Sequence, residues 1–149
     1  MFPEHKLRSE YFFPLFADDL FCDLTPKSLK SLDKIKQTKQ FEKDVCFFSS
    51  GEIPRCFYIL RKGKAQLLLN DIHIVRLIEP NEILGLTVMI ADMPCETDAE
   101  TITPCICEFI KREDFIRFLR NEPEVSFRLV RMLGLHLQKN RQLFFSSIN

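Results

Sequence analysis

Residues 84–101 have the sequence Leu84-Gly85-Leu86-Thr87-Val88-Met89-Ile90-Ala91-Asp92-Met93-Pro94-Cys95-Glu96-Thr97-Asp98-Ala99-Glu100-Thr101. A glycine opens this stretch, the apolar residues 87–90 favour one turn of helix, and Asp92-Met93-Pro94 returns the chain to a β-strand. A loop of this kind between two strands can aim backbone N–H groups inward at an anion. The pattern therefore predicts the fold of a phosphate-holding loop.

The charges of the same loop do not suit a phosphate. No Lys, Arg or His lies between Glu79 and Lys111, so the loop has no cation of its own. It carries instead the acidic residues Asp92, Glu96, Asp98 and Glu100. We therefore expect the fold of a phosphate loop without its phosphate chemistry.

Length and composition predict one domain. At 149 residues and 46% hydrophobic content, the chain can bury an adequate core without metal or disulfide staples. Lys+Arg and Asp+Glu number 21 each, and this zero net charge disfavours nucleic acids and anionic membranes as partners. We expect a single domain of residues 1–149, made of a helical lid (1–35), a β-roll (36–111) and C-terminal helices (112–149).

The N-terminus and the cysteines indicate a cytoplasmic protein. Residues 1–10 mix charges of both signs and lack a long apolar run, so they suit neither a signal peptide nor a membrane span. Scattered cysteines within apolar segments fit free thiols in a reducing compartment; they are Cys22, Cys46, Cys56, Cys95, Cys105 and Cys107.

Two features of these cysteines bear on function. Cys105 and Cys107 share one face of a predicted strand, but no further ligand pair accompanies them, so we expect core packing and no metal or cofactor. Cys95 lies where loop amides can converge and lower a thiol pKa, which leaves a redox-reactive thiol and an inert one as alternatives.

Turn signals divide residues 36–111 into short β-rich runs. Strands this short, with few helical interruptions, predict a mainly β fold with flanking helices, built on an antiparallel jelly-roll-like β-roll. The predicted strands span residues 39–41, 45–48, 56–61, 65–69, 72–78, 99–103 and 105–110.

Helical patterns lie on both sides of this β region. Residues 11–35 have helical periodicity, with Thr25 as a predicted N-cap and Pro26 at the first helical position. Helical periodicity returns after Lys111, breaks at Asn121-Glu122-Pro123 and resumes to about residue 145.

The last helix has a broad apolar face. Its residues Val130, Leu133, Leu137, Asn140 and Phe144 recur at alternating spacings of three and four, the pattern of a dimeric coiled coil with one register-setting Asn. The same pattern suits a C-terminal helix that packs only on its own domain. Both interpretations stay open.

Four groups of residues carry a resemblance to a known family. They are Gly51-Glu52 at a tight turn, Phe57-Tyr58-Ile59-Leu60-Arg61-Lys62-Gly63-Lys64 in a hairpin, Ile78-Glu79-Pro80-Asn81-Glu82-Ile83-Leu84-Gly85 before the loop, and Lys111-Arg112-Glu113-Asp114-Phe115 with Asn121-Glu122-Pro123-Glu124-Val125. Through these residues the chain resembles the cyclic-nucleotide-binding domain family, and the resemblance extends over nearly its whole length. That family includes catabolite-activator-type transcription factors and the regulatory subunits of cyclic-AMP-dependent protein kinase.

The resemblance implies a ligand-binding cassette that this chain has altered. In the family, a Gly-Glu pair begins the cassette and Pro-Arg-Ser/Thr-Ala ends it; the glutamate binds the ribose, and the arginine pairs with the cyclic phosphate. This chain keeps the glycine as Gly85 and the proline as Pro94. It has Leu86 in place of the glutamate, Cys95 in place of the arginine and Glu96 in place of the hydroxyl residue. The implied ligand-binding positions are Gly85, Leu86, Thr87, Cys95, Glu96 and Thr97.

These replacements predict that ordinary cyclic-nucleotide binding is lost, unless Arg55 or Arg76 reaches the site from elsewhere. The resemblance also implies a helix-turn-helix domain after the last helix in the family's transcription factors. This chain stops at Asn149, so we expect no direct DNA binding of that kind.

The expected function is that of a non-catalytic regulatory module, because no nucleophile, base and oxyanion set can be assembled. We expect a homodimer through the last helix, or a contact with another protein partner, and no membrane association. The alternative is a small-molecule sensor, which binds a cyclic nucleotide in an altered mode or another effector in the β-roll pocket.

Overall fold

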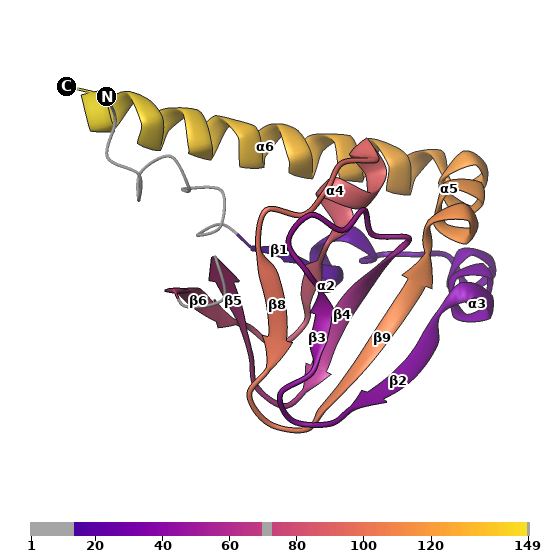
Figure 1. Ribbon diagram of the computed structural model, residues 1–149. Helices are drawn as coiled ribbons and strands as arrows, with labels where there is room; N and C mark the ends of the chain where they lie inside the picture. Colours follow the sequence, from indigo (N-terminus) through magenta and orange to yellow (C-terminus); the bar gives the residue numbers. More distant parts are fainter. Residues whose placement is uncertain (1–13, 70–72, 149) are drawn as a thin grey trace.

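The computed structural model describes residues 14–69 and 73–148, except the side chains of 73–75, 140 and 143–148 (Figure 1). Its antiparallel strands form two sheets, with the orders β1-β7-β4-β9-β2 and β3-β8-β5-β6. The strands are β1 (Leu15–Phe16), β2 (Gln37–Phe41), β3 (Cys46–Phe48), β4 (Cys56–Lys62), β5 (Ala65–Leu69), β6 (His73–Ile78), β7 (Glu82–Leu84), β8 (Asp98–Thr101) and β9 (Cys105–Lys111). The expected mainly β fold, an antiparallel β-roll with flanking helices, is confirmed.

The helices flank this roll. They are α2 (Ala17–Leu20), α3 (Pro26–Ile35), α4 (Leu86–Ala91), α5 (Arg112–Asn121) and α6 (Pro123–Ile148). The Thr25 side chain accepts a hydrogen bond from the Ser28 N–H at 3.1 Å, and Pro26 is the first residue of α3, as the sequence predicts. Among the described helices, none is long and apolar enough to cross a lipid bilayer.

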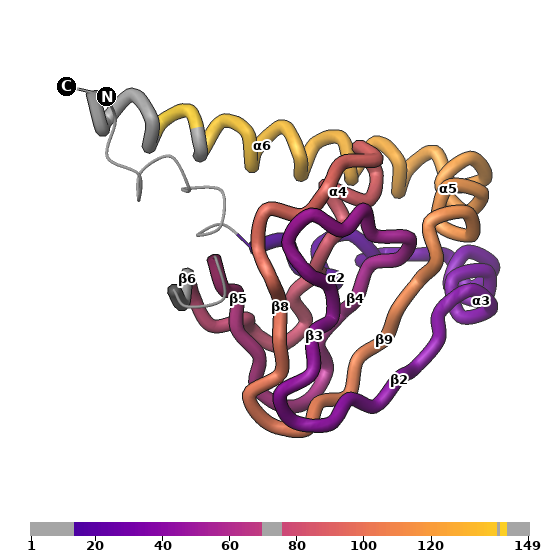
Figure 2. The backbone as a smooth tube through the Cα atoms, viewed as in Figure 1, coloured from indigo at the N-terminus to yellow at the C-terminus, as the bar shows by residue number. Residues whose placement is uncertain are grey.

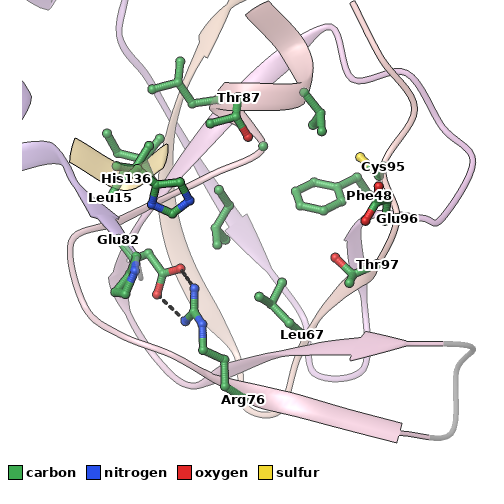
Figure 3. A pocket seen from close by; sticks show the side chains of 16 residues that line it. Leu15, Phe48, Leu67, Arg76, Glu82, Thr87, Cys95, Glu96, Thr97 and His136 are labelled. Atoms are coloured by element: carbon green, nitrogen blue, oxygen red, sulfur yellow. Dashed lines mark hydrogen bonds and ion pairs between the residues drawn. The ribbon is translucent and has the colours of Figure 1, made fainter. Parts of the chain in front are cut away.

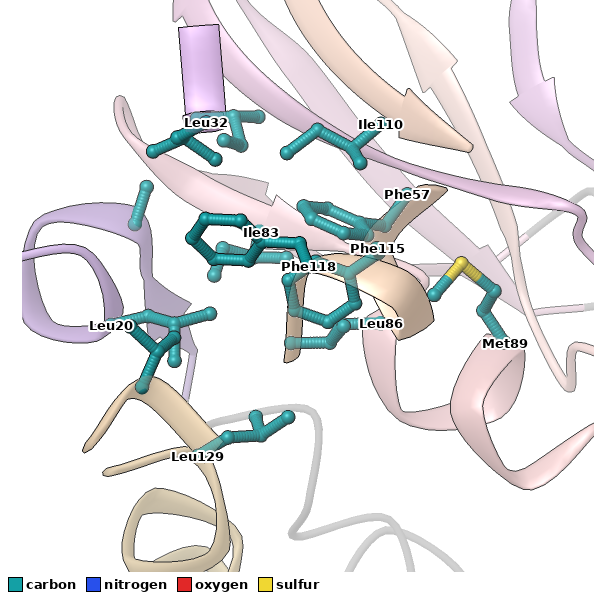
Figure 4. Close-up of a cluster of buried hydrophobic side chains, with 13 residues drawn as sticks. Leu20, Leu32, Phe57, Ile83, Leu86, Met89, Ile110, Phe115, Phe118 and Leu129 are labelled. Carbon is teal, nitrogen blue, oxygen red and sulfur yellow. The ribbon is translucent and has the colours of Figure 1, made fainter. Parts of the chain in front are cut away.

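Two hydrophobic clusters form the core. The first packs the helices on the five-stranded sheet, with Phe57 and Phe115 at its centre in an edge-to-face contact of 4.8 Å between ring centroids (Figure 4). The second combines residues of both sheets and includes Phe47, Leu67 and Cys107. Because its members come from the two sheets, this second cluster is the interior of the roll.

The long helix α6 runs across one end of the roll and extends past it (Figures 1 and 2). Val125 and Leu129 near its start are buried in the first cluster. The Arg128 guanidinium donates a hydrogen bond to the Leu20 carbonyl oxygen at 2.7 Å, which ties α6 to α2. The first turns of α6 are therefore part of the domain core.

The predicted strands all correspond to observed strands, although residue 72 of the fifth lies outside the described residues. The helical prediction is wrong at Leu15 and Phe16, which form β1; its first residues, 11–13, lie outside the described part. Leu15 pairs with Ile83 of β7, and the Ala17 N–H donates to the Asn81 carbonyl oxygen at 2.9 Å. Pairing with a distant strand thus outweighs the local helical pattern.

Candidate functional site

A pocket of about 240 Å³ lies between the start of α4, the strand β7, the segment before β8 and the helix α6 (Figure 3). This volume is slightly below the usual range of small-molecule pockets, roughly 300–1,000 Å³. The lining residues are Pro14, Leu15, Phe48, Leu67, Arg76, Glu82, Ile83, Leu84, Gly85, Leu86, Thr87, Val88, Cys95, Glu96, Thr97 and His136.

Backbone geometry holds the loop at this pocket in place. Gly85 has φ +85°, and a Cβ atom there would lie 3.2 Å from the Phe48 ring, so glycine suits both the turn and the close approach. Further along, the Cys95 N–H donates to the Glu52 carbonyl oxygen, and the Gly51 N–H donates to the Cys95 carbonyl oxygen, each at 2.8 Å. The turn at Gly51 and Glu52 therefore holds the second half of the loop.

The six ligand-binding positions that the resemblance implies all line this pocket: Gly85, Leu86, Thr87, Cys95, Glu96 and Thr97. Leu86, Cys95 and Thr97 are buried, whereas Thr87 and Glu96 are exposed. Leu86 packs in the helical cluster and Cys95 in the cluster between the sheets. The structure thus brings the six residues together, and their role in binding stays a prediction.

Of the two arginines that the sequence offers as substitutes, Arg76 lines the pocket. Its guanidinium makes a bidentate pair with the Glu82 carboxylate, with N–O distances of 2.8 and 2.5 Å. Glu82 is only 2% exposed and also accepts a hydrogen bond from the Glu79 N–H. Arg55 is not among the lining residues and pairs at 3.6 Å with Asp92 instead.

Glu82 and His136 also line the pocket, although the sequence patterns did not predict them there. His136 follows the buried Leu129 by seven residues on α6, a spacing that places both on one helical face and was a usable signal. Glu82 gave no comparable signal, because its pairing with Arg76 depends on how β6 and β7 come together.

Two titratable groups of the pocket are uncharged at neutral pH. Burial raises the pKa of the Cys95 thiol to about 11, and the carboxylates of Glu52 and Asp98 act in the same direction. Burial lowers the pKa of His136, and the positive charges of Lys139 and Arg76 lower it further. The raised pKa of Cys95 favours the inert thiol over the redox-reactive alternative.

Among the residues that the structure describes, one buried polar side chain has no hydrogen-bond partner. Thr97 is 6% exposed, and within the described part of the chain nothing bonds to its hydroxyl. An unpaired buried polar group typically costs about 1–3 kcal/mol. The other buried polar residues, each hydrogen-bonded, are Ser28, Glu82, Asp98 and Thr101.

The predicted dimer face of α6 is partly exposed. Val130 and Leu137 are 66% and 60% exposed, whereas Leu133 is half-buried and packs on the helical cluster. The side chains of Asn140 and Phe144 lie outside the described residues. Phe127 is 70% exposed and precedes Val130 by three residues, so the structure adds it to the exposed apolar face.

Within the described residues, no group of three His, Cys, Asp or Glu side chains could hold a metal ion. The six cysteines are free thiols.

Comparison with protein-family models gives a match of residues 38–122 to the cyclic nucleotide-binding domain. No match is found among curated proteins.

Several solved structures share the fold. The Catabolite Activator Protein of Thermus thermophilus is similar with a TM-score of 0.74 and 20% identity, over 83% of this chain and 60% of that protein. The chain thus spans somewhat more than half of the length of that protein. The N-terminal domain of a Streptomyces coelicolor A3(2) transcriptional regulator has a TM-score of 0.71 and 18% identity, over 85% and 93% of the two chains. The sensor domain of the regulator DNR from Pseudomonas aeruginosa has a TM-score of 0.70 and 19% identity, over 90% and 93%.

Proposed function

The chain belongs to the cyclic nucleotide-binding domain family, and on this premise we propose that it is a non-catalytic regulatory module that does not bind cyclic nucleotides in the family's usual way. It acts through protein contacts of its long helix α6, with a second copy of itself or with another protein. We further propose that residues 1–149 work as one domain of lid, β-roll and C-terminal helices, in the cytoplasm.

The state of Arg76 carries this proposal. It is the sole Lys or Arg among the described lining residues, and a buried carboxylate already neutralises it. Moving Arg76 to a phosphate would leave Glu82 buried without a partner, and breaking a buried pair in this way costs about 3–5 kcal/mol. At about 1.4 kcal/mol per tenfold, such a cost weakens binding roughly a hundredfold or more.

The exposed face of α6 supports the contact role. Its 26 residues span about 39 Å at roughly 1.5 Å per residue. Phe127, Val130, Gly134 and Leu137 follow one another at spacings of three and four, and the three apolar side chains among them are exposed. A Cβ atom at Gly134 would meet nothing within 4 Å, so this side of the helix is open to a neighbour.

The chemistry of the pocket supports a non-catalytic role. A nucleophilic thiol acts as the thiolate, and a Cys95 pKa of about 11 keeps that thiol protonated at neutral pH. His136 and Cys95 line opposite sides of the pocket in Figure 3, so this imidazole is not placed as a base for that thiol.

A calorimetric and thermal-shift titration with cyclic AMP and cyclic GMP tests the proposal. We expect no saturable stabilisation of the wild-type chain at millimolar ligand. A bound ligand at 100 times its Kd would add about 2.7 kcal/mol to the free energy of unfolding. A micromolar Kd for either nucleotide would contradict the proposal.

A double variant, Cys95→Arg with Glu96→Ser, makes the same test sharper. It restores the family's cation and hydroxyl at the end of the loop, so we expect cyclic AMP to bind at least about tenfold more tightly than to wild type. The matched control, Cys95→Ala with Glu96→Ser, removes the Glu96 charge without adding a cation and should gain less.

The pocket and the unpaired Thr97 hydroxyl support a second function, that of a sensor for another small effector. Such an effector differs chemically from a cyclic nucleotide, because the described lining residues offer a phosphate no positive charge that is not already paired.

A further inference from the structure

The Thr97 hydroxyl is placed to meet a ligand rather than the protein. It is more than nine-tenths buried, lacks a partner among the described residues, and points toward the middle of the pocket in Figure 3. The pocket therefore presents one unsatisfied hydrogen-bonding group to whatever occupies it.

The walls around this hydroxyl are mostly apolar. Phe48, Leu67 and Leu84 are buried members of the cluster between the sheets, and Val88 packs against that cluster. Leu86 adds a further apolar wall. An occupant in contact with these side chains gains from an apolar body.

The charges of the pocket disfavour an anion. Arg76 and Glu82 cancel each other in a bidentate pair, and His136 is held neutral by burial and by neighbouring positive charges. Glu96 contributes a negative charge at the exposed part of the lining. A carboxylate or phosphate would therefore lose its hydration without meeting an available cation among the lining residues that the structure describes.

We propose that this pocket binds an uncharged, mainly apolar small molecule through a single hydroxyl or carbonyl group, which hydrogen-bonds to Thr97. The inference rests on the proposed function, because it requires a pocket that does not take cyclic nucleotides. An apolar cavity of about 150 Å³ is enough for benzene, so a pocket of about 240 Å³ suits a molecule somewhat larger than one ring.

The test uses 1-octanol and octanoate, which share an apolar chain and differ in charge. Calorimetry and thermal shift on the full chain should show saturable binding of 1-octanol, at least about tenfold tighter than binding of octanoate. Equal or tighter binding of octanoate, or no binding of 1-octanol at millimolar concentration, would overturn the proposal.

Thr97→Val separates an anchoring role from a structural one. The variant keeps the shape of the side chain and removes the hydroxyl, so 1-octanol should bind roughly 2- to 10-fold more weakly. The free variant should unfold about 2–6 °C higher than wild type, because an unpaired buried group is gone. Thr38→Val, at an exposed position of β2, is the control and should change neither value. An unchanged affinity in Thr97→Val would refute the anchoring role.

Val88→Phe tests the location of the bound molecule. The larger side chain fills the pocket, so 1-octanol binding should be lost while circular dichroism shows a folded protein. Unchanged binding would place the alcohol elsewhere, for example on α6, and would overturn the proposal.

A wild-type chain that binds neither 1-octanol nor cyclic AMP would remove this inference alone, whereas cyclic AMP binding would remove the proposed function.

Discussion

Single residues in this chain are constrained mainly where two backbones come close together. Gly63 connects β4 and β5 with φ +100°, and a Cβ atom there would lie 2.9 Å from the Cys105 Cα and closer still to the Pro104 carbonyl oxygen. Gly51 has a similar φ of +88° but has nothing within 4 Å of such an atom. A side chain at Gly51 would therefore meet backbone strain alone, whereas a side chain at Gly63 would meet both backbone strain and steric overlap.

We expect Gly63→Ala to lower the free energy of unfolding by about 2–4 kcal/mol, since it combines an unfavourable φ with overpacking against backbone. Gly51→Ala introduces only the unfavourable φ, so it should lower the free energy of unfolding by about 1–2 kcal/mol. Urea denaturation of both variants measures the difference. Equal decreases in the free energy of unfolding would mean that the chain at Pro104 moves away from the added methyl group without an energetic cost.

At the scale of elements, α6 belongs to the domain on one side and is exposed on the other. Val125 and Leu129 are buried in the core, whereas Phe127, Val130 and Leu137 are at least 60% exposed. A helix with two apolar faces needs a second surface to cover one of them.

We predict that the double variant Val130→Glu with Leu137→Glu weakens self-association, or binding to another partner, at least tenfold, because it places carboxylates in an apolar contact. Folding should be little changed, since both side chains are exposed in the single chain. Sedimentation velocity over a concentration series measures the assembly. Gln142→Glu, at an exposed polar position of the same helix, is the matched control.

At the scale of the whole molecule, His136 couples stability to pH. It lies on α6 but lines the roll pocket with Arg76 and Glu82, so a charge on it affects the contact between helix and roll. Its pKa is lowered in the folded state, so the unfolded chain takes up the proton first. Stability is thus fully present above pH 6.5 and falls as the pH drops from 6.5 toward the folded pKa.

His136→Gln should remove part of this pH dependence. We expect the wild-type Tm to decrease between pH 6.5 and 5 more steeply than that of the variant, because Gln takes up no proton in either state. Thermal unfolding across this range is the measurement. Parallel curves for the two proteins would show that His136 does not contribute.

The sequence predicts the fold well and the site only in part. The alternating strand patterns and the Thr25-Pro26 cap are local signals, so the expected β-roll and the start of α3 are confirmed. Strands β1 and β7 were missed because they have only two and three residues and depend on pairing with distant strands: β1 pairs with β7, and β7 also pairs with β4. Local periodicity cannot report such a pairing.

The site depends even more on contacts between distant elements. The family resemblance implies ligand-binding positions that include Gly85 and Cys95, and both residues line one pocket. The pairing of Arg76 with Glu82 and the unpaired state of Thr97 arise only when β6, β7 and the segment before β8 meet. Those two features decide which ligand charge the pocket accepts, and no spacing in the sequence encodes them.

The composition of α6 gives the molecule an uneven distribution of charge. Of the 21 basic and 21 acidic residues, four basic residues and one acidic residue lie in α6, which leaves the rest of the chain with three excess negative charges. A chain that is neutral overall is therefore an electric dipole with its positive end along the helix. Two copies aligned with their helices parallel would repel each other at long range, and added salt would strengthen rather than weaken that assembly by screening the repulsion.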